Sequence, residues 1–188
     1  AKICVATGTT SEVNASQFFQ KHNLKVSFLT FTERAQAHAA YAEKKCHAFT
    51  GDRSGLAAER SSLPSPEDHV ILRDIISKEP LGPVTRDDDS RWTSLVRWTL
   101  FALINAEELG INSKSVAAEK GQQAVALGAP AARSLGLSRD WLVKLIGGVG
   151  NYGEIFERNL GPDTPLKLNR GMNALWYEAG LLYAPPLK

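Results

Sequence analysis

Short apolar runs alternate with helical patterns over the first sixty residues of the chain. Lys2–Ala6 is a compact apolar run that stops at Thr7-Gly8, and 25–31 alternates apolar and polar positions, as half-buried strands do. The predicted strands are Lys2–Ala6, 25–31 and 46–50. The predicted helices are the stretch from Thr10 to about His22, then 32–45 and 52–60. A strand–helix series with short connections predicts a parallel sheet covered by helices.

Two further extended segments follow this series. The stretch 69–76 has the composition of another strand, and 78–86 contains two prolines and a glycine. Proline lacks the backbone N–H and clashes with the preceding helical turn, so a continuous helix over 78–86 is excluded.

Beyond this point the pattern becomes helical. Three aspartates at 87–89 precede apolar residues at helical spacing, which predicts a helix over 88–108 with its acidic start at the positive end of the helix dipole. The Ala-, Gln- and Gly-rich stretch 116–130 predicts a weak helix or a mobile linker, and 139–159 and 170–178 predict two more helices. We therefore expect two domains, an α/β domain at 1–84 and a mostly helical one at 85–188.

Composition and charge exclude several classes of protein. The chain has 188 residues, 43% of them hydrophobic and 22% charged, with a net charge of +2. Lys and Arg are spread evenly, so no basic patch indicates nucleic acid as a partner. The longest apolar runs, such as 98–104, are too short to span a bilayer. The first residues lack the pattern of a signal peptide, so we expect a processed chain or a fragment.

Two cysteines, Cys4 and Cys46, each lie in a predicted strand. Residues alone allow two buried free thiols, because cysteine behaves as a small hydrophobe, or one disulfide in an oxidising compartment. There is no CxxC pair and no histidine cluster at ligand spacing. We therefore expect neither a metal nor a cofactor.

Candidate binding residues follow two of the predicted strands. Gly8, Thr9 and Thr10 join a strand to a helix, where unpaired backbone N–H groups and hydroxyls suit an anion. Asp52 follows the strand 46–50. Thr9 and Asp52 each have a simpler interpretation, in which the side chain only caps the helix that follows. Ligands of parallel α/β sheets bind at the carboxyl ends of the strands, so both groups are expected at one edge.

Together, these two groups match a small molecule that carries a carboxylate and an ammonium. No catalytic set accompanies them, because none of the four histidines has an evident nucleophile or metal partner and no GxSxG or HExxH motif occurs. We predict a binding protein and not an enzyme.

Longer runs of sequence resemble the general L-amino-acid-binding proteins of bacterial polar-amino-acid ABC transporters. The runs are CVATGTT at 4–10, DRSGLA at 52–57, IISKEPLGP at 75–83, RWTLFALINAE at 97–107, VGNYGE at 149–154 and YAPP at 183–186. They extend the resemblance over the whole chain.

This resemblance implies a type II periplasmic-binding-protein-like α/β fold, with one complete parallel-sheet lobe and a helical remainder of the other. It implies that Gly8, Thr9 and Thr10 hold the α-carboxylate of a free L-amino acid, and that Asp52 pairs with the α-ammonium. It further implies a Cys4–Cys46 bridge, a periplasmic location and a membrane permease as partner.

The resemblance also raises a second function. The stretch that in relatives carries a carboxylate-clamping arginine and a covering aromatic has no counterpart here, so the chain looks like the carboxy-terminal two-thirds of such a protein. The predicted helices 88–108 and 139–159 would then lack their usual partner and expose apolar faces. The alternative is therefore a truncated, oligomerising protein with little ligand affinity, for which we expect a homodimer through 92–104.

Overall fold

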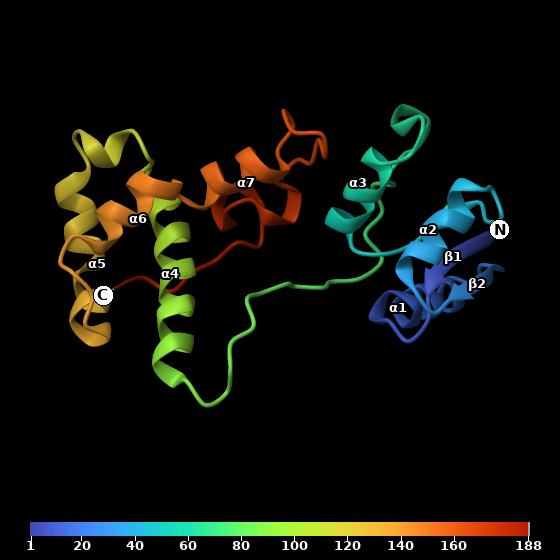
Figure 1. Ribbon diagram of the computed structural model, residues 1–188, viewed down its shortest axis with the longest axis horizontal. Coiled ribbons are helices and arrows are strands. Elements are labelled where there is room, and N and C mark those ends of the chain that lie inside the picture. The colour runs from blue at the N-terminus through green and yellow to red at the C-terminus, as the bar shows by residue number, and fades with distance from the viewer. Residues whose placement is uncertain (188) are drawn as a thin grey trace. The chain divides into compact units, whose positions relative to one another are not determined.

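The computed structural model describes residues 1–187 and divides them into two compact units (Figure 1). Unit 1 comprises Ala1–Leu81, and unit 2 begins at Gly82. Unit 1 holds all the strands of the sheet in the described part of the chain, whereas unit 2 is helical.

Unit 1 is built on a parallel sheet. Its strands are β1 (Lys2–Ala6), β2 (Ser27–Phe31) and β3 (Ala48–Phe49), in the order β2-β1-β3. The central strand β1 pairs along its whole length with β2, whereas β3 pairs with it through two residues. The predicted parallel sheet is confirmed, with β2 and β3 shorter than the patterns suggested.

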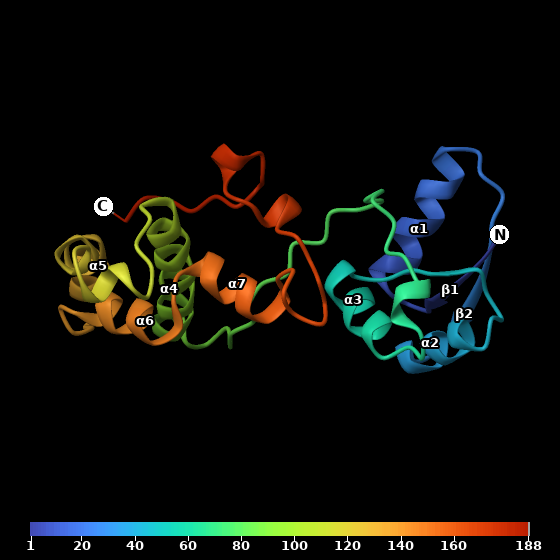
Figure 2. The same cartoon turned by 90° about the horizontal axis from the view of Figure 1, so that it is seen from above.

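Helices cover both faces of this sheet. They are α1 (Thr10–Lys21) and α2 (Arg34–Ala42), and α3 (Arg53–Ser61) follows β3. The strands lie between α1 and α2 in both views (Figure 2). The connection through α1 leads from β1 to β2 on one side, and the connection through α2 leads back past β1 to β3 on the other. Because both crossovers are right-handed, the two helices lie on opposite faces of the sheet. The buried core joins β1 to α2 through Cys4, Ala37, Ala40 and Cys46.

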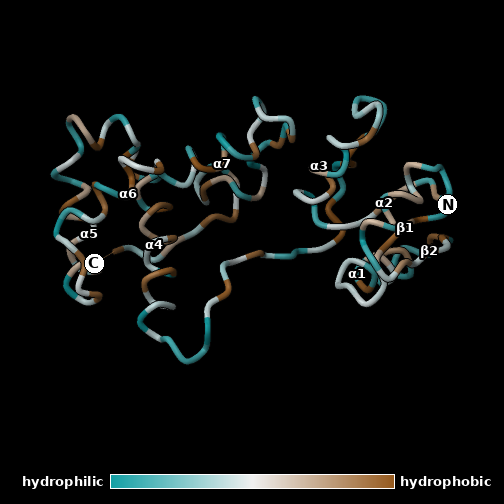
Figure 3. Tube along the Cα trace, in the orientation of Figure 1, coloured by the Kyte–Doolittle hydropathy of each residue, from teal (hydrophilic) through white to brown (hydrophobic). Residues whose placement is uncertain are grey.

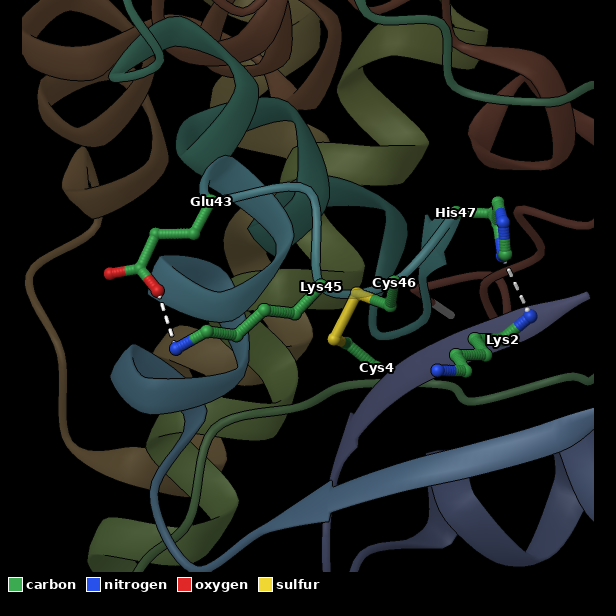
Figure 4. Close-up of a disulfide and its surroundings, with 6 residues drawn as sticks. All are labelled: Lys2, Cys4, Glu43, Lys45, Cys46 and His47. Atoms are coloured by element: carbon green, nitrogen blue, oxygen red, sulfur yellow. Dashed lines mark hydrogen bonds and ion pairs between the residues drawn. A yellow bond between two sulfur atoms is a disulfide. The ribbon is translucent and has the colours of Figure 1, made fainter.

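A disulfide joins Cys4 of β1 to Cys46, two residues before β3 (Figure 4). The two sulfur atoms are 2.04 Å apart, and both cysteines are buried. Beside it, the Lys2 backbone N–H donates to His47 Nδ1 at 2.9 Å. The implied bridge is confirmed.

The prediction of a strand at 69–76 is wrong. After the 3-10 turn η1 (Pro66–Asp68), residues 69–85 form neither helix nor strand. Val70 and Leu72 are 77% and 69% exposed, and apolar stretches are visible along this segment (Figure 3). Alternating apolar residues indicate a strand only where another strand pairs with them, and within residues 1–187 none does. The absence of a helix over 78–86 is confirmed.

Unit 2 is a set of packed helices. They are α4 (Ser90–Glu108), α5 (Gly121–Leu135), α6 (Trp141–Val149) and α7 (Tyr152–Leu160), with 3-10 turns η2 (Ser115–Ala117), η3 (Gly171–Asn173) and η4 (Trp176–Glu178). Asp89 caps α4 by accepting the Trp92 N–H at 2.8 Å, as its acidic start predicts. Helix α4 packs on α5 and α7, and α5 packs on α6.

Helix α5 decides between the two alternatives expected for 116–130, because most of this stretch is helical and not a linker. Its buried residues are small: Ala124, Gly128, Ala131 and Ala132. A Cβ on Gly128 would lie 2.8 Å from Trp141 Nε1, which donates to the Gly128 carbonyl at 2.8 Å. Small side chains let α6 approach the backbone closely, and they also make the amphipathic pattern faint.

The predicted helix 139–159 is two helices, because the chain breaks at Gly150 and Asn151. Gly150 has a φ of +82°, which favours glycine. Asn151 then caps α7 in a capping box with Glu154. The stretch 170–178 contains only η3 and η4, so the predicted helix there is also wrong.

Glu154 holds this break in place with its carboxylate. Its oxygens accept the Ser113 hydroxyl at 2.5 Å and the Asn151 N–H at 2.9 Å. Burial alone would raise the pKa of Glu154, but the hydrogen bonds from Ser113 and Asn151 and the charge of Arg158 hold that pKa below its ordinary value. The ionised form is therefore the one that the fold stabilises.

We expect Glu154→Gln to lower the free energy of unfolding at neutral pH by about 1–2 kcal/mol, because charge-assisted hydrogen bonds are lost. A lowered folded-state pKa gives stability that is present above the unfolded pKa and disappears as the pH falls through the folded one. The gap between wild type and variant should therefore narrow in acid, measured by urea unfolding across that range. Glu157→Gln, exposed on the same helix, is the control. A gap that stays constant with pH would contradict this role.

Reducing the disulfide should destabilise unit 1. The bridge spans 42 residues of sequence, and the chain entropy that it removes from the unfolded state corresponds to about 4 kcal/mol. A thiol reductant should lower the urea midpoint of the wild type, followed by circular dichroism, and leave a Cys4→Ala/Cys46→Ala variant unchanged. Two titratable thiols in denatured, unreduced protein would refute the bridge.

Candidate ligand-binding site

A cavity of about 320 Å³ opens in unit 1 at the carboxyl ends of β1 and β3. Its lining comprises Ala6, Thr9, Thr10, Ser11, Arg34, Phe49, Thr50 and Asp52. This is the sheet edge at which parallel α/β folds bind ligands. Three of the four predicted ligand-binding residues, Thr9, Thr10 and Asp52, line this one cavity, while Gly8 lies just outside its lining.

The turn between β1 and α1 is held by its own hydrogen bonds. The Gly8 backbone has a φ of +71°, and its N–H donates to Glu12 Oε2 at 2.7 Å. The Thr9 hydroxyl donates to the Ala6 carbonyl at 2.7 Å and accepts the Glu12 N–H at 3.2 Å. Thr9 therefore caps α1, and the groups of Gly8 and Thr9 build the turn.

The next two residues carry the free donors. The N–H groups of Thr10 and Ser11 lie in the first turn of α1, where a helix supplies no acceptor, and they have no partner among residues 1–187. Unpaired N–H groups at the positive end of a helix dipole favour a carboxylate. The unpaired donors thus lie two and three residues beyond Gly8.

The Thr10 hydroxyl is occupied by a residue that the sequence patterns missed. It donates to Glu79 Oε2 at 2.8 Å, and the Asn14 side-chain amide donates to the other oxygen of that carboxylate. Glu79 lies in the irregular segment at 69–81, far along the chain. This pair of bonds ties the segment to the first turn of α1.

Asp52 stands at the start of α3 but does not cap it with its side chain. Its carboxylate is 41% exposed, and one oxygen lies 4.0 Å from Arg34 Nη1. Capping is therefore not what holds this side chain, and its oxygens remain accessible from the cavity.

Arg34 is the second residue that the sequence patterns missed. Its guanidinium binds Glu59 through Nε at 2.7 Å and Nη2 at 3.0 Å, and lies over the Phe49 ring at 5.5 Å. It follows β2 by three residues. The rule that ligands bind at the carboxyl ends of parallel strands, which selected Thr9 and Asp52, could therefore have found Arg34 as well. The cavity thus combines backbone donors, one carboxylate and one guanidinium.

Residues 1–187 show neither a cluster of metal ligands nor a membrane-spanning helix. In the described part of the chain, no group of three or more His, Cys, Asp or Glu residues could hold a metal ion. None of the helices described in residues 1–187 combines the length and the apolar character that crossing a membrane requires.

The fold and this cavity define an α/β unit with a small polar cavity at the carboxyl ends of its strands, and comparison with known proteins narrows the class. The general L-amino acid-binding periplasmic protein AapJ of Rhizobium johnstonii is 45% identical over the whole chain, which spans 58% of its length. The glutamate/glutamine/aspartate/asparagine-binding protein BztA of Rhodobacter capsulatus is 43% identical, again over the whole chain and 58% of its own length. No family model matches the chain.

A solved structure extends the likeness to three dimensions. An ABC transporter periplasmic binding protein from Brucella ovis, with glutathione bound, shares 46% identity with a TM-score of 0.89. The match covers all of this chain and 61% of that one. These matches confirm the resemblance to amino-acid-binding periplasmic proteins. They also confirm the periplasmic-binding-protein fold, for the part of that fold that this chain spans. The chain spans less than two thirds of the length of these relatives.

Removing the partners of Glu79 should loosen the segment at 69–81. In a Thr10→Val/Asn14→Ala variant the carboxylate loses both donors, and we expect trypsin to cleave after Lys78 several-fold faster than in the wild type, because protease sensitivity follows local opening. Ser11→Ala changes a hydroxyl in the same turn without touching Glu79 and is the control. Equal cleavage rates in all three proteins would show that the two bonds do not hold the segment.

Proposed function

We propose that this chain binds free L-amino acids in the periplasm and presents them to the membrane permease of an ABC transporter. The observation that carries the proposal is the cavity lined both by residues with unpaired N–H groups, Thr10 and Ser11, and by the half-exposed carboxylate of Asp52. The N–H groups of Thr10 and Ser11 receive the α-carboxylate, with Gly8 and Thr9 shaping the turn. Asp52 accepts hydrogen bonds from the α-ammonium.

The electrostatics of the cavity suit a zwitterion. A carboxylate is favoured at the amino terminus of α1, and an ammonium is favoured beside Asp52. The two groups come from different strand ends, so a ligand that carries only one charge would leave the other group unpaired. Selection of free amino acids over simple acids or amines follows from this pairing.

The names of the relatives support the same chemistry. AapJ and BztA are described as amino-acid-binding proteins, and the Brucella ovis structure contains glutathione. Glutathione carries a free α-ammonium and α-carboxylate on its glutamyl residue, so it shares the head group of an amino acid. A protein of Escherichia coli, 42% identical, is named a putative amino-acid ABC transporter-binding protein.

The alternative, an oligomerising protein with little ligand affinity, has less support. Its expected contact surface was 92–104, but Leu103 and Ile104 are buried within unit 2 at 8% and 3% exposure. Helix α4 is already covered there by α5 and α7. Trp92, at 52% exposure, is the large apolar side chain of this stretch that remains open. Packing inside unit 2 therefore favours the binding function.

Asp52→Asn should weaken amino-acid binding about 10- to 100-fold, because a charge-assisted hydrogen bond contributes roughly 1.5–3 kcal/mol. Thr10→Ala should cost less, since the backbone N–H groups remain. Isothermal titration calorimetry with a panel of L-amino acids measures both. Asp68→Asn, an exposed change of the same type in unit 1, is the control. If the wild type binds and Asp52→Asn binds equally well, Asp52 does not hold the ammonium.

A further inference from the structure

The Arg34 guanidinium is held in one position by its surroundings. Glu59 accepts from two of its nitrogens, Nε and Nη2, in a bidentate pair, and the ring of Phe49 lies beneath it. A bidentate pair fixes the plane of the guanidinium as well as its distance. Arg34 is therefore preorganised and does not sample many rotamers at the cavity.

Two glycines leave room for this arginine. A Cβ built on Gly51 would lie 2.7 Å from Nη1 and Nη2, and one built on Gly55 would lie 2.7 Å from Nη2. Gly55 lies inside α3, where glycine is disfavoured relative to alanine. Neither glycine has a positive φ, so backbone conformation does not require glycine at these positions. The lack of a side chain instead allows the guanidinium to approach closely.

The same arrangement leaves donors facing the cavity. A guanidinium has five N–H donors, and the bonds to Glu59 use one on Nε and one on Nη2. Nη1 has a single charged neighbour in the described chain, the Asp52 oxygen 4.0 Å away, which is beyond hydrogen-bonding distance. Arg34, Phe49 and Asp52 all line the cavity. A permanent positive charge with unused donors thus lies beside the group assigned to the ligand ammonium.

We propose that Arg34 determines specificity by binding a second carboxylate, the one on the side chain of the ligand. The proposal rests on the amino-acid-binding function stated above and names its substrate class as dicarboxylic amino acids. The α-carboxylate goes to the turn and the ammonium to Asp52, so the side chain of the ligand is the part that remains to meet Nη1. A carboxylate accepts from a guanidinium more strongly than a neutral amide does.

Glutamate and glutamine test this assignment, because they have nearly the same shape and differ in side-chain charge. In calorimetry on the full chain we expect the wild type to bind glutamate about tenfold more tightly than glutamine. Arg34→Met should reduce glutamate affinity at least tenfold and change glutamine affinity less than about twofold, so the preference disappears. Arg53→Met, which removes an exposed charge next to Asp52, is the matched control and should keep the preference.

A second variant keeps the positive charge of Arg34 but changes the position of its guanidinium. Gly55→Ala places a Cβ against Nη2 and so displaces the guanidinium, and we expect the preference for glutamate to fall in a protein that circular dichroism shows to be folded. This variant carries the test if Arg34→Met fails to fold by circular dichroism. A preference that survives the displacement of Nη2 counts against the proposal.

Three results would overturn the assignment, each in a different way. Equal losses for glutamate and glutamine in Arg34→Met would show that Arg34 positions Asp52 or contacts the α-carboxylate. A wild type that binds both amino acids equally would leave the amino-acid-binding function standing and remove the specificity role. A wild type that binds neither would remove the function itself.

Discussion

The disulfide between Cys4 and Cys46 is the constraint on which the geometry of unit 1 depends. Strand β3 pairs with β1 through two residues, extended by two hydrogen bonds, from the His47 N–H to the Lys2 carbonyl and from the Thr50 N–H to the Cys4 carbonyl. So short a pairing is weak on its own. The covalent link two residues earlier keeps β3 in register, and Asp52 follows three residues after that strand. The disulfide therefore helps to hold the strand that precedes Asp52 against the strand that precedes Thr9 and Thr10.

Local patterns predicted most of unit 1 because its elements follow ordinary periods. The apolar run of β1, the alternation in β2 and the Thr9 cap are visible within a few residues of sequence. Unit 2 was harder to predict. Helix α5 buries alanine and glycine, whose hydropathy signal is faint, and the break before α7 depends on one glycine conformation. The exposed segment at 69–76 has the residues of a strand but lacks the partner that would make it one.

The candidate site divides in the same way. The carboxyl-end rule brought Thr9, Thr10 and Asp52 to one cavity, and it would have brought Arg34 there if applied to the end of β2. Glu79 could not be found by any local rule, since it reaches Thr10 across 69 residues of sequence through an irregular segment. Such contacts depend on the path of a loop, which side-chain periodicity does not encode.

The division of the chain into two units also separates its chromophores. All four tryptophans, at 92, 98, 141 and 176, lie in unit 2, while the single tyrosine of unit 1 is Tyr41. Intrinsic tryptophan fluorescence therefore comes from unit 2, and the cavity of unit 1 has no tryptophan in its lining. An indole introduced in place of Phe49, at the wall of the cavity, would make that half of the molecule visible.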